Sequence, residues 1–187
     1  MGRPWLLPGL GPVGRDFRYR LRIRMPSGVE WECEDPYRFG RVLSDLDTYL
    51  LAEGTHYRNF EKLGAHPMTI DGVTGVHFAV WAPNAERVSV VGSFNDWDGR
   101  RHPMRNLGMS GVWEIFLPGL VEGDFYKLEI RSRPGGLIRV KSDPYAFRCE
   151  MRPGTASIVH GPDKHRWTDD AWLAEGRSRR NALDAPI

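Results

Sequence analysis

The sequence predicts an all-β fold in which two antiparallel sheets pack against each other. Two observations carry this prediction. Short segments alternate between apolar and polar side chains with a period of two, as half-buried strands do. The chain of 187 residues also contains 21 glycines and 14 prolines at short intervals, as turns between short strands require.

The first predicted strands form a hairpin near the N-terminus. From Phe17 to Arg24, apolar and arginine side chains alternate strictly, which predicts a half-buried strand. A turn over Pro26–Gly28 leads into a second strand, Val29–Cys33. The arginine row could hold an anion, but the glutamates of the second strand favour pairing of charges across the hairpin.

A short helix follows over Ser44–Glu53. Ser44 can cap its N-terminus, acidic residues occupy its first turn, and Gly54 ends it. Its apolar residues fall at helical spacing and predict the packed face: Leu46, Tyr49 and Leu50. The segment from Asn59 to Pro67 is expected to approach the next strand without regular structure.

Downstream of Gly72 the pattern becomes densely β. Five strands are predicted, with turn residues between them: Val76–Trp81, Arg87–Val91, Gly111–Leu117, Phe125–Arg131 and Leu137–Lys141. Strands this short and evenly spaced are typical of an immunoglobulin-like sandwich of about 90 residues. Three of their aromatic residues are expected in the core: Trp81, Trp113 and Tyr126.

The C-terminal region returns to helix. Thr168 and the acidic residues after it predict a capped helix that runs towards Asn181. The final Pro186–Ile187 reads like the start of a strand, so we expect a truncated polypeptide.

Composition excludes several classes of function. The formal net charge of +2 comes from 26 basic and 24 acidic residues mixed along the chain, so no basic field for nucleic acid is expected. Neither a signal peptide nor a membrane span is visible. Cys33 and Cys149 are expected to be free thiols in a reducing cytoplasm. The six histidines have no metal-ligand spacing, and we expect no cofactor.

The loop Gly92–Gly99 is the strongest candidate for binding. It places Trp97 beside the amide of Asn95 and the carboxylate of Asp96. A flat indole flanked by hydrogen-bonding groups suits a sugar ring, which has an apolar face and a hydroxyl rim. Burial of about 100 Å² of such a face contributes roughly 2.5 kcal/mol before ordering costs, so one tryptophan alone binds weakly.

Several motifs together resemble one family. They read GVTGVHFAVWAPNAERVSVVGSFNDWDGRRHPM, GVWEIFLPGL, YKLEI, KSDPYAF and RPGTAS. They are similar to the carbohydrate-binding module of family 48 that precedes the catalytic barrel of bacterial glycogen branching enzymes. Upstream, DPYRF and LGAHP resemble the end of a preceding sandwich and its linker in the same enzymes, and argue against the equivalent module of a debranching or trehalose-forming enzyme.

The resemblance implies a domain organisation. Residues 1–36 would be the C-terminal part of a first β-sandwich, and residues 37–62 a helical linker. Residues 63–160 would form the carbohydrate-binding module. Residues 161–187 would lead to a missing catalytic barrel, on which Trp167 and Trp172 are expected to dock.

The resemblance also implies which residues meet glucan. In starch- and glycogen-binding relatives, sugar stacks on a tryptophan that matches Trp97 and contacts a lysine that matches Lys127. With their neighbours in the loop, the expected glucan-binding set is Trp97, Lys127, Asn95 and Asp96. Strong binders carry a second tryptophan in the following hairpin, where this sequence has Gly136, Leu137 and Ile138.

Two functions therefore remain open. The region could bind or position α-1,4-glucan or glycogen for the barrel, or it could brace the barrel and bind no sugar, with Trp97 packed against that domain and Lys127 solvated. In either case catalysis is not expected here. Branching enzymes cut α-1,4 bonds and form α-1,6 branches with carboxylates from barrel strands, whereas Asp96 and Asp98 are expected to form a turn.

Overall fold

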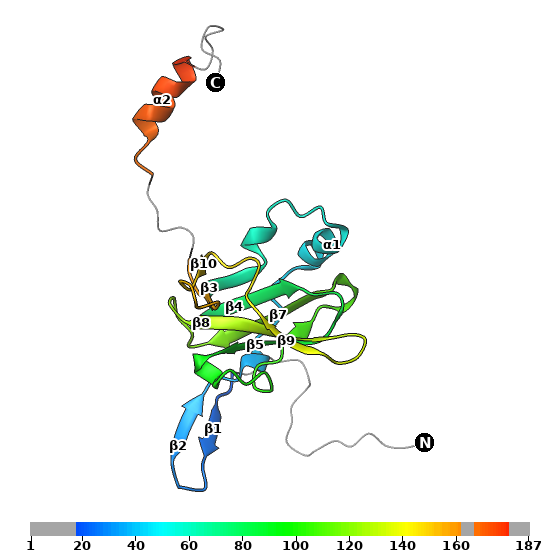
Figure 1. Cartoon of the computed structure of the whole chain (residues 1–187). Helices are drawn as coiled ribbons and strands as arrows, with labels where there is room; N and C mark the ends of the chain where they lie inside the picture. Colours follow the sequence, from blue (N-terminus) through cyan, green and yellow to red (C-terminus); the bar gives the residue numbers. More distant parts are fainter. Residues whose placement is uncertain (1–17, 162–166, 180–187) are drawn as a thin grey trace.

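The computed structural model describes residues 18–161 and 167–179. Two sheets form a sandwich, with a separate two-stranded hairpin on one side and a C-terminal helix, α2 (Asp170–Arg179), that extends away from it (Figure 1). The predicted all-β fold is confirmed. Within the described residues, no helix is long and apolar enough to span a membrane.

The first sheet of the sandwich has four antiparallel strands in the order β3-β4-β7-β6. Their bounds are Gly64–Ile70 for β3, Val73–Trp81 for β4, Arg105–Asn106 for β6 and Val112–Pro118 for β7. β3 was not predicted, because Gly64 and Pro67 interrupt its apolar pattern. As an edge strand it tolerates Pro67, whose missing N–H would break a ladder in the centre of a sheet.

The second sheet has five strands, in which β8 is central. The path β10-β11-β8-β5 is joined by β9, which also pairs with β8. The bounds are Ala85–Gly92 for β5, Phe125–Ser132 for β8, Ile138–Lys141 for β9, Arg148–Cys149 for β10 and Ser157–Ile158 for β11. Short 3-10 turns complete the sandwich at η3 (Ser93–Asn95) and η4 (Gly108–Ser110). All five predicted strands are present.

The main core lies between the two sheets. Alternate residues of β4 point into it, among them Phe78, whose ring meets that of Tyr126 edge-on at 4.9 Å between centroids. Tyr126 is completely buried, and Trp113 is 6% exposed. The prediction that these two aromatics are core residues is confirmed. Trp81 was also predicted there, but it is 52% exposed, because its position in β4 has the opposite parity and faces outward.

A linker layer covers the outer face of the four-stranded sheet. It consists of η1 (Pro36–Arg38), α1 (Asp45–Glu53) and η2 (Asn59–Glu61) with their connections. A second apolar cluster lies beneath it: Leu43, Leu51, Leu63, Ala79 and Val112. Because of this layer, β4 is buried on both faces for most of its length.

The helix α1 forms where the sequence predicts it. Ser44 and Asp47 make a reciprocal capping box, and Gly54 ends the helix with φ of 76°. The predicted packed face was wrong, since Leu46 and Tyr49 are 65% and 58% exposed. Thr48 and Leu51 are buried instead, so the helix is rotated relative to the face that apolar spacing indicates.

The N-terminal hairpin of β1 (Leu21–Arg24) and β2 (Glu30–Cys33) has one charged and one apolar face. Arg22 pairs with Glu32 at 2.8 Å, and Arg24 pairs with Glu30. The predicted pairing of charges across the strands is therefore confirmed. The predicted half-burial is wrong for the described residues, because Leu21 and Ile23 are 40% and 38% exposed. Phe17, where the strand was expected to begin, lies outside the described residues.

Candidate functional site

The loop after β5 is held from within by Asn95. Its Oδ1 accepts a hydrogen bond from the Gly92 amide at 2.9 Å, and its Nδ2 donates to the Val90 carbonyl at 2.9 Å. A further contact joins Nδ2 to Nδ1 of His102 at 2.8 Å. Asn95 is only 1% exposed. The amide is therefore committed to the loop itself, and a contact between Asn95 and a ligand stays a prediction.

The next two residues have an unusual backbone. Asp96 and Trp97 have φ of 57° and 58°, in the left-handed region that costs non-glycine residues free energy. The Trp97 amide donates to the Gly92 carbonyl at 2.9 Å, which closes the loop. This conformation presents the Trp97 side chain at the surface, where it is 44% exposed.

Trp97 lines a hollow of about 260 Å³ together with Phe125, Lys127, Glu150 and Ala156. Phe125 begins β8 and is 39% exposed, so two aromatic side chains border the same space. Lys127 donates to the Thr155 hydroxyl at 2.7 Å, which fixes its ammonium at the rim. The structure thus places Trp97 and Lys127 of the expected glucan-binding set at one hollow, together with Phe125 and Glu150.

Asp96 lies beside this hollow but does not line it. Its side chain is 77% exposed and pairs with Arg101 at 3.0 Å. The neighbouring Asp98 binds the Arg100 guanidinium and backbone amide, and these hydrogen bonds hold the pKa of Asp98 well below its usual range. Both carboxylates therefore stabilise the loop, which agrees with their predicted role in a turn.

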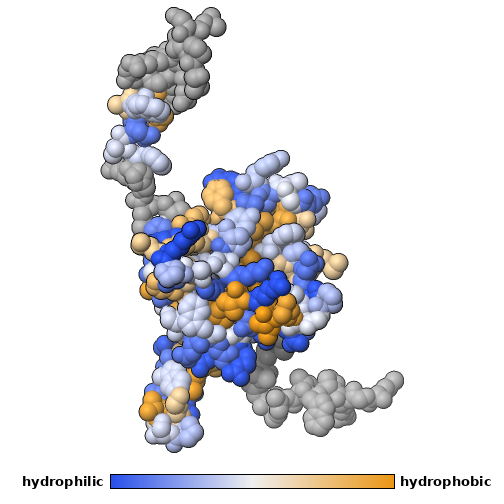
Figure 2. Space-filling model, viewed as in Figure 1, coloured by the Kyte–Doolittle hydropathy of each residue, from blue (hydrophilic) through white to orange (hydrophobic). Residues whose placement is uncertain are grey.

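The open sheet face continues from this hollow towards β9. Lys127 and Glu129 of β8 point outward, and the side chain of Val140 lies opposite Glu129 in the ladder. Figure 2 shows apolar side chains gathered on this face over β9, where Leu137, Ile138 and Val140 are each more than half exposed. Aliphatic residues thus occupy the hairpin in which strongly binding relatives were expected to have a tryptophan.

The hollow has no groups for hydrolysis or transfer of a sugar. Of the described residues that line it, only Glu150 is a carboxylate, and its Oε2 already accepts a hydrogen bond from the Ala156 amide at 3.1 Å. Glycoside chemistry with retention requires a pair of carboxyl groups across the scissile bond. Elsewhere in the described part of the chain, no three His, Cys, Asp or Glu side chains gather to hold a metal ion.

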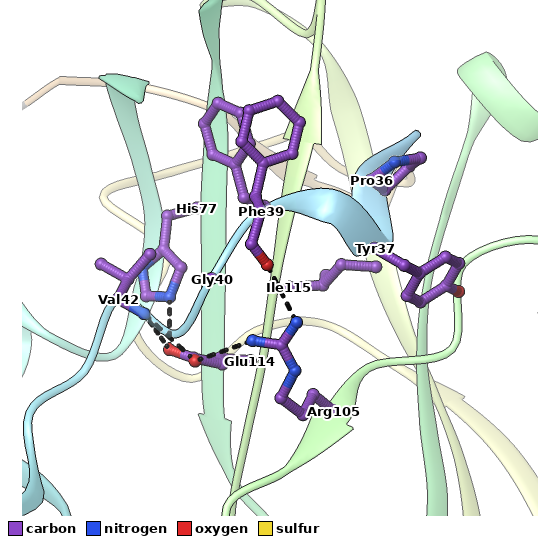
Figure 3. Close-up of a pocket in the computed structure, with 10 residues that line it drawn as sticks. Pro36, Tyr37, Phe39, Gly40, Val42, His77, Arg105, Glu114 and Ile115 are labelled. Atoms are coloured by element: carbon purple, nitrogen blue, oxygen red, sulfur yellow. Dashed lines mark hydrogen bonds and ion pairs between the residues drawn. The ribbon is translucent and has the colours of Figure 1, made fainter. Parts of the chain in front are cut away.

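A buried polar cluster on the other sheet has a structural role. Glu114 of β7 is 2% exposed and accepts a hydrogen bond from the Leu43 amide at 3.0 Å. Figure 3 shows that it also accepts one from His77, at 3.1 Å, and that Arg105 reaches both Glu114 and the Phe39 carbonyl. Burial raises the pKa of Glu114, but the hydrogen bonds from His77 and the linker amides outweigh it, so the pKa lies below its usual range. The adjoining cavity of about 10 Å³ has room for no more than a water molecule. This cluster therefore anchors the linker to the sheet.

A family model and several solved structures match part of this chain. Residues 62–146 match the family described as carbohydrate-binding module 48 (isoamylase N-terminal domain). Among solved structures, a type I pullulanase of Bacillus subtilis complexed with maltose is 30% identical over 57% of this chain and 14% of that chain, with a TM-score of 0.45.

Several curated relatives match nearly the whole chain. The 1,4-alpha-glucan branching enzyme of Rubrobacter xylanophilus is 58% identical over 95% of this chain and 24% of its own length. That of Cereibacter sphaeroides is 53% identical over 100% of this chain and 25% of its own length. The chain thus spans about a quarter of the length of these relatives. Residues 62–146 belong to the carbohydrate-binding module 48 family, within a chain that is homologous to part of the bacterial 1,4-alpha-glucan branching enzymes.

Proposed function

We propose that this module binds α-1,4-glucan chains in the hollow around Trp97. The observation that carries the proposal is the left-handed backbone at Trp97, which fixes an exposed indole beside Phe125. Backbone strain of this kind persists only where the surrounding structure fixes it, and it is concentrated at active sites and ligand-binding sites. Lys127 and Glu150 at the rim supply a donor and an acceptor for sugar hydroxyls.

The expected affinity is low. Two aromatic faces that each cover about 100 Å² of sugar contribute roughly 5 kcal/mol together, from which the cost of ordering the chain is subtracted. We therefore expect a binding free energy of about −4 kcal/mol, which corresponds to a dissociation constant in the millimolar range. Binding this weak serves to hold a polymer near another site, because neighbouring glucosyl units rebind before the chain diffuses away.

In the longer enzyme the module would deliver glucan to a catalytic barrel. The barrel would cut an α-1,4 bond and rejoin the fragment as an α-1,6 branch, which requires the pair of carboxyl groups that the hollow around Trp97 lacks. The described residues would then position substrate without reacting with it. Both cysteines, Cys33 and Cys149, are free thiols, which fits the reducing cytoplasm in which we place this enzyme.

A role as a brace for the barrel is the second candidate. It is favoured by two exposed tryptophans beyond the sandwich, Trp167 at 73% and Trp172 at 63%. A barrel that packed on this segment would bury both indoles and gain from the removal of their apolar surface from water. The two roles are compatible, because these tryptophans lie outside the hollow that contains Trp97.

The experiment that tests glucan binding is affinity electrophoresis in glycogen-containing gels. Trp97→Ala should lower the affinity at least five-fold, since it removes one of two stacking surfaces while the left-handed backbone remains. Trp172→Ala is the matched control, as it removes an exposed tryptophan far along the chain, and it should migrate like the unmodified protein. Equal retardation of Trp97→Ala and the control would refute the proposal.

A further inference from the structure

A second hollow lies on the opposite face of the sandwich. It has the same volume as the first, about 260 Å³, and is bordered by the linker layer and one end of the four-stranded sheet. His56 lies in the loop after α1, Asn59 begins η2, Trp81 ends β4, and Tyr145 lies in the loop after β9. The rest of the lining comes from Leu51, Gly54, Leu63 and Pro144, so the wall is mostly apolar and carries two polar side chains.

Trp81 is exposed because the linker layer ends beside it. The outward residues before it on β4, His77 and Ala79, are both 2% exposed under that layer. Trp81 has the same parity, yet it remains 52% exposed. A large apolar surface is therefore left open at the end of an otherwise covered strand, at the place where the layer leaves a hollow.

The polar wall of the hollow is held in place. Asp47 accepts hydrogen bonds from the Ser44 amide and hydroxyl and from His56 Nε2 at 3.2 Å, and it pairs with Lys62 at 3.3 Å. Burial raises the pKa of Asp47, but these contacts outweigh it and hold the pKa far below its usual range. The carboxylate is thus ionised and can only accept, so Nε2 of His56 carries a proton.

The other nitrogen of His56 has an unmet hydrogen-bonding capacity. Nδ1 is buried and has no hydrogen-bond partner, although the residue borders the hollow. Nδ1 is an acceptor in the neutral ring and a donor in the charged ring, and a hydroxyl group, which both donates and accepts, can satisfy either form. A small tilt of the imidazole towards the hollow would expose this atom to a hydroxyl group.

We propose that this second hollow binds a glucosyl ring of an α-glucan chain. Trp81 and Tyr145 offer apolar faces to the ring, while Asn59 and His56 offer hydrogen bonds to its hydroxyl rim. An apolar peptide fits less well, because it would leave Nδ1 of His56 and the Asn59 amide without partners. The inference does not depend on Trp97, whose hollow lies on the outer face of the other sheet.

Two sites on opposite faces would make the module bivalent. A single linear chain that occupies one face cannot easily reach the other, whereas a branched particle presents many chains at once. The affinity for glycogen should then exceed the affinity for a short oligosaccharide by a factor larger than the number of sites. The reason is that the second site binds its chain at a high effective concentration once the first site is occupied. This consequence separates a bivalent module from one with a single site.

The test is an NMR titration of Trp97→Ala with maltoheptaose. The expected result is saturable shifts at the Trp81 indole and at the amides of Asn59 and Tyr145, with a change at the His56 ring. Trp81→Ala should abolish the shifts at Asn59 and Tyr145 but leave those around Trp97 in otherwise unmodified protein. Tyr57→Ala is the control, because this aromatic residue is 95% exposed on the same loop and does not line the hollow.

Two results would overturn the inference. The first is the absence of saturable shifts at Trp81 and Tyr145 in a well-dispersed spectrum of Trp97→Ala. The second is a change at these signals when the protein alone is concentrated, which would mean that another copy of the chain occupies the hollow. Trp81→Phe covers the case in which Trp81→Ala fails to fold, and it should lower the affinity of this site about two-fold to five-fold. Failure of the Trp97 site in the same titrations would leave this result unaffected, so the two proposals are distinguishable.

Discussion

The two outer faces of the sandwich differ in what covers them. The face of the four-stranded sheet lies under the linker layer, and side chains there are buried even when they are polar, as Glu114 and His77 are. No helix covers the face of the five-stranded sheet among the described residues, and Lys127, Ile138 and Val140 remain accessible. On β5 the outward residues Ser89 and Val91 are also buried. Along β8 and β9, however, the same alternation leaves the outward side chains at a surface that a ligand can reach.

This difference explains why polar residues have opposite roles on the two faces. Under the linker, a carboxylate is retained because it satisfies two backbone amides and a histidine that would otherwise be buried without partners. On the open face, the charged ends of Lys127 and Glu150 remain at the rim of a hollow. Coverage, rather than residue type, decides which polar groups support the fold and which can meet a ligand.

The largest expected effect comes from removal of the linker anchor. Glu114→Ala leaves His77 and the amides of Val42 and Leu43 buried without an acceptor, which should lower the free energy of unfolding by about 3 kcal/mol. Urea unfolding followed by tryptophan fluorescence measures this loss. Glu114→Gln, which keeps one acceptor oxygen, should lose about half as much.

The same variants sharpen the comparison between the faces. If the open face is independent of the linker, folded Glu114→Gln should bind glycogen as tightly as the unmodified protein. A parallel loss of stability and glycogen affinity would show instead that the linker layer shapes the hollow around Trp97.

A smaller effect is expected from Asn95 on the open side. Asn95→Ala removes the partners of the Gly92 amide and the Val90 carbonyl, which should cost about 2 kcal/mol of stability and also weaken glucan binding, because Trp97 loses its support. Thermal unfolding and affinity electrophoresis of the same sample test this. Weaker binding with unchanged stability would mean that Asn95 touches the sugar directly.

Much of the fold could be predicted from the sequence, because alternation within short strands is a local signal. The five strands, the caps of α1 and the charge pairs of the hairpin all depend on residues close in sequence. β3 could not be predicted in the same way, since Gly64 and Pro67 break its pattern. The burial of Thr48 and the exposure of Trp81 depend on where the linker layer ends, which is a tertiary property that periodicity does not contain.

The candidate site was predictable in part. The sequence places Trp97 and Lys127 in one hollow only through the resemblance to a family, because Trp97 lies in the loop after β5 and Lys127 lies on β8. Asn95 was expected to face a ligand, but asparagine equally often closes a loop, and only the structure shows that its amide turns inward. Phe125 was missed, although its position directly before the Tyr126–Lys127 pair could have indicated an aromatic residue beside the lysine.

The most direct test of the account is an amide and indole NMR titration of the unmodified chain with maltoheptaose. The account predicts a dispersed spectrum, saturable shifts around Trp97, Phe125 and Lys127 at millimolar sugar, and no change at the buried pair His77 and Glu114. A dispersed spectrum in which the Trp97 and Phe125 signals do not move would contradict it, and would favour the proposed role as a brace for another domain.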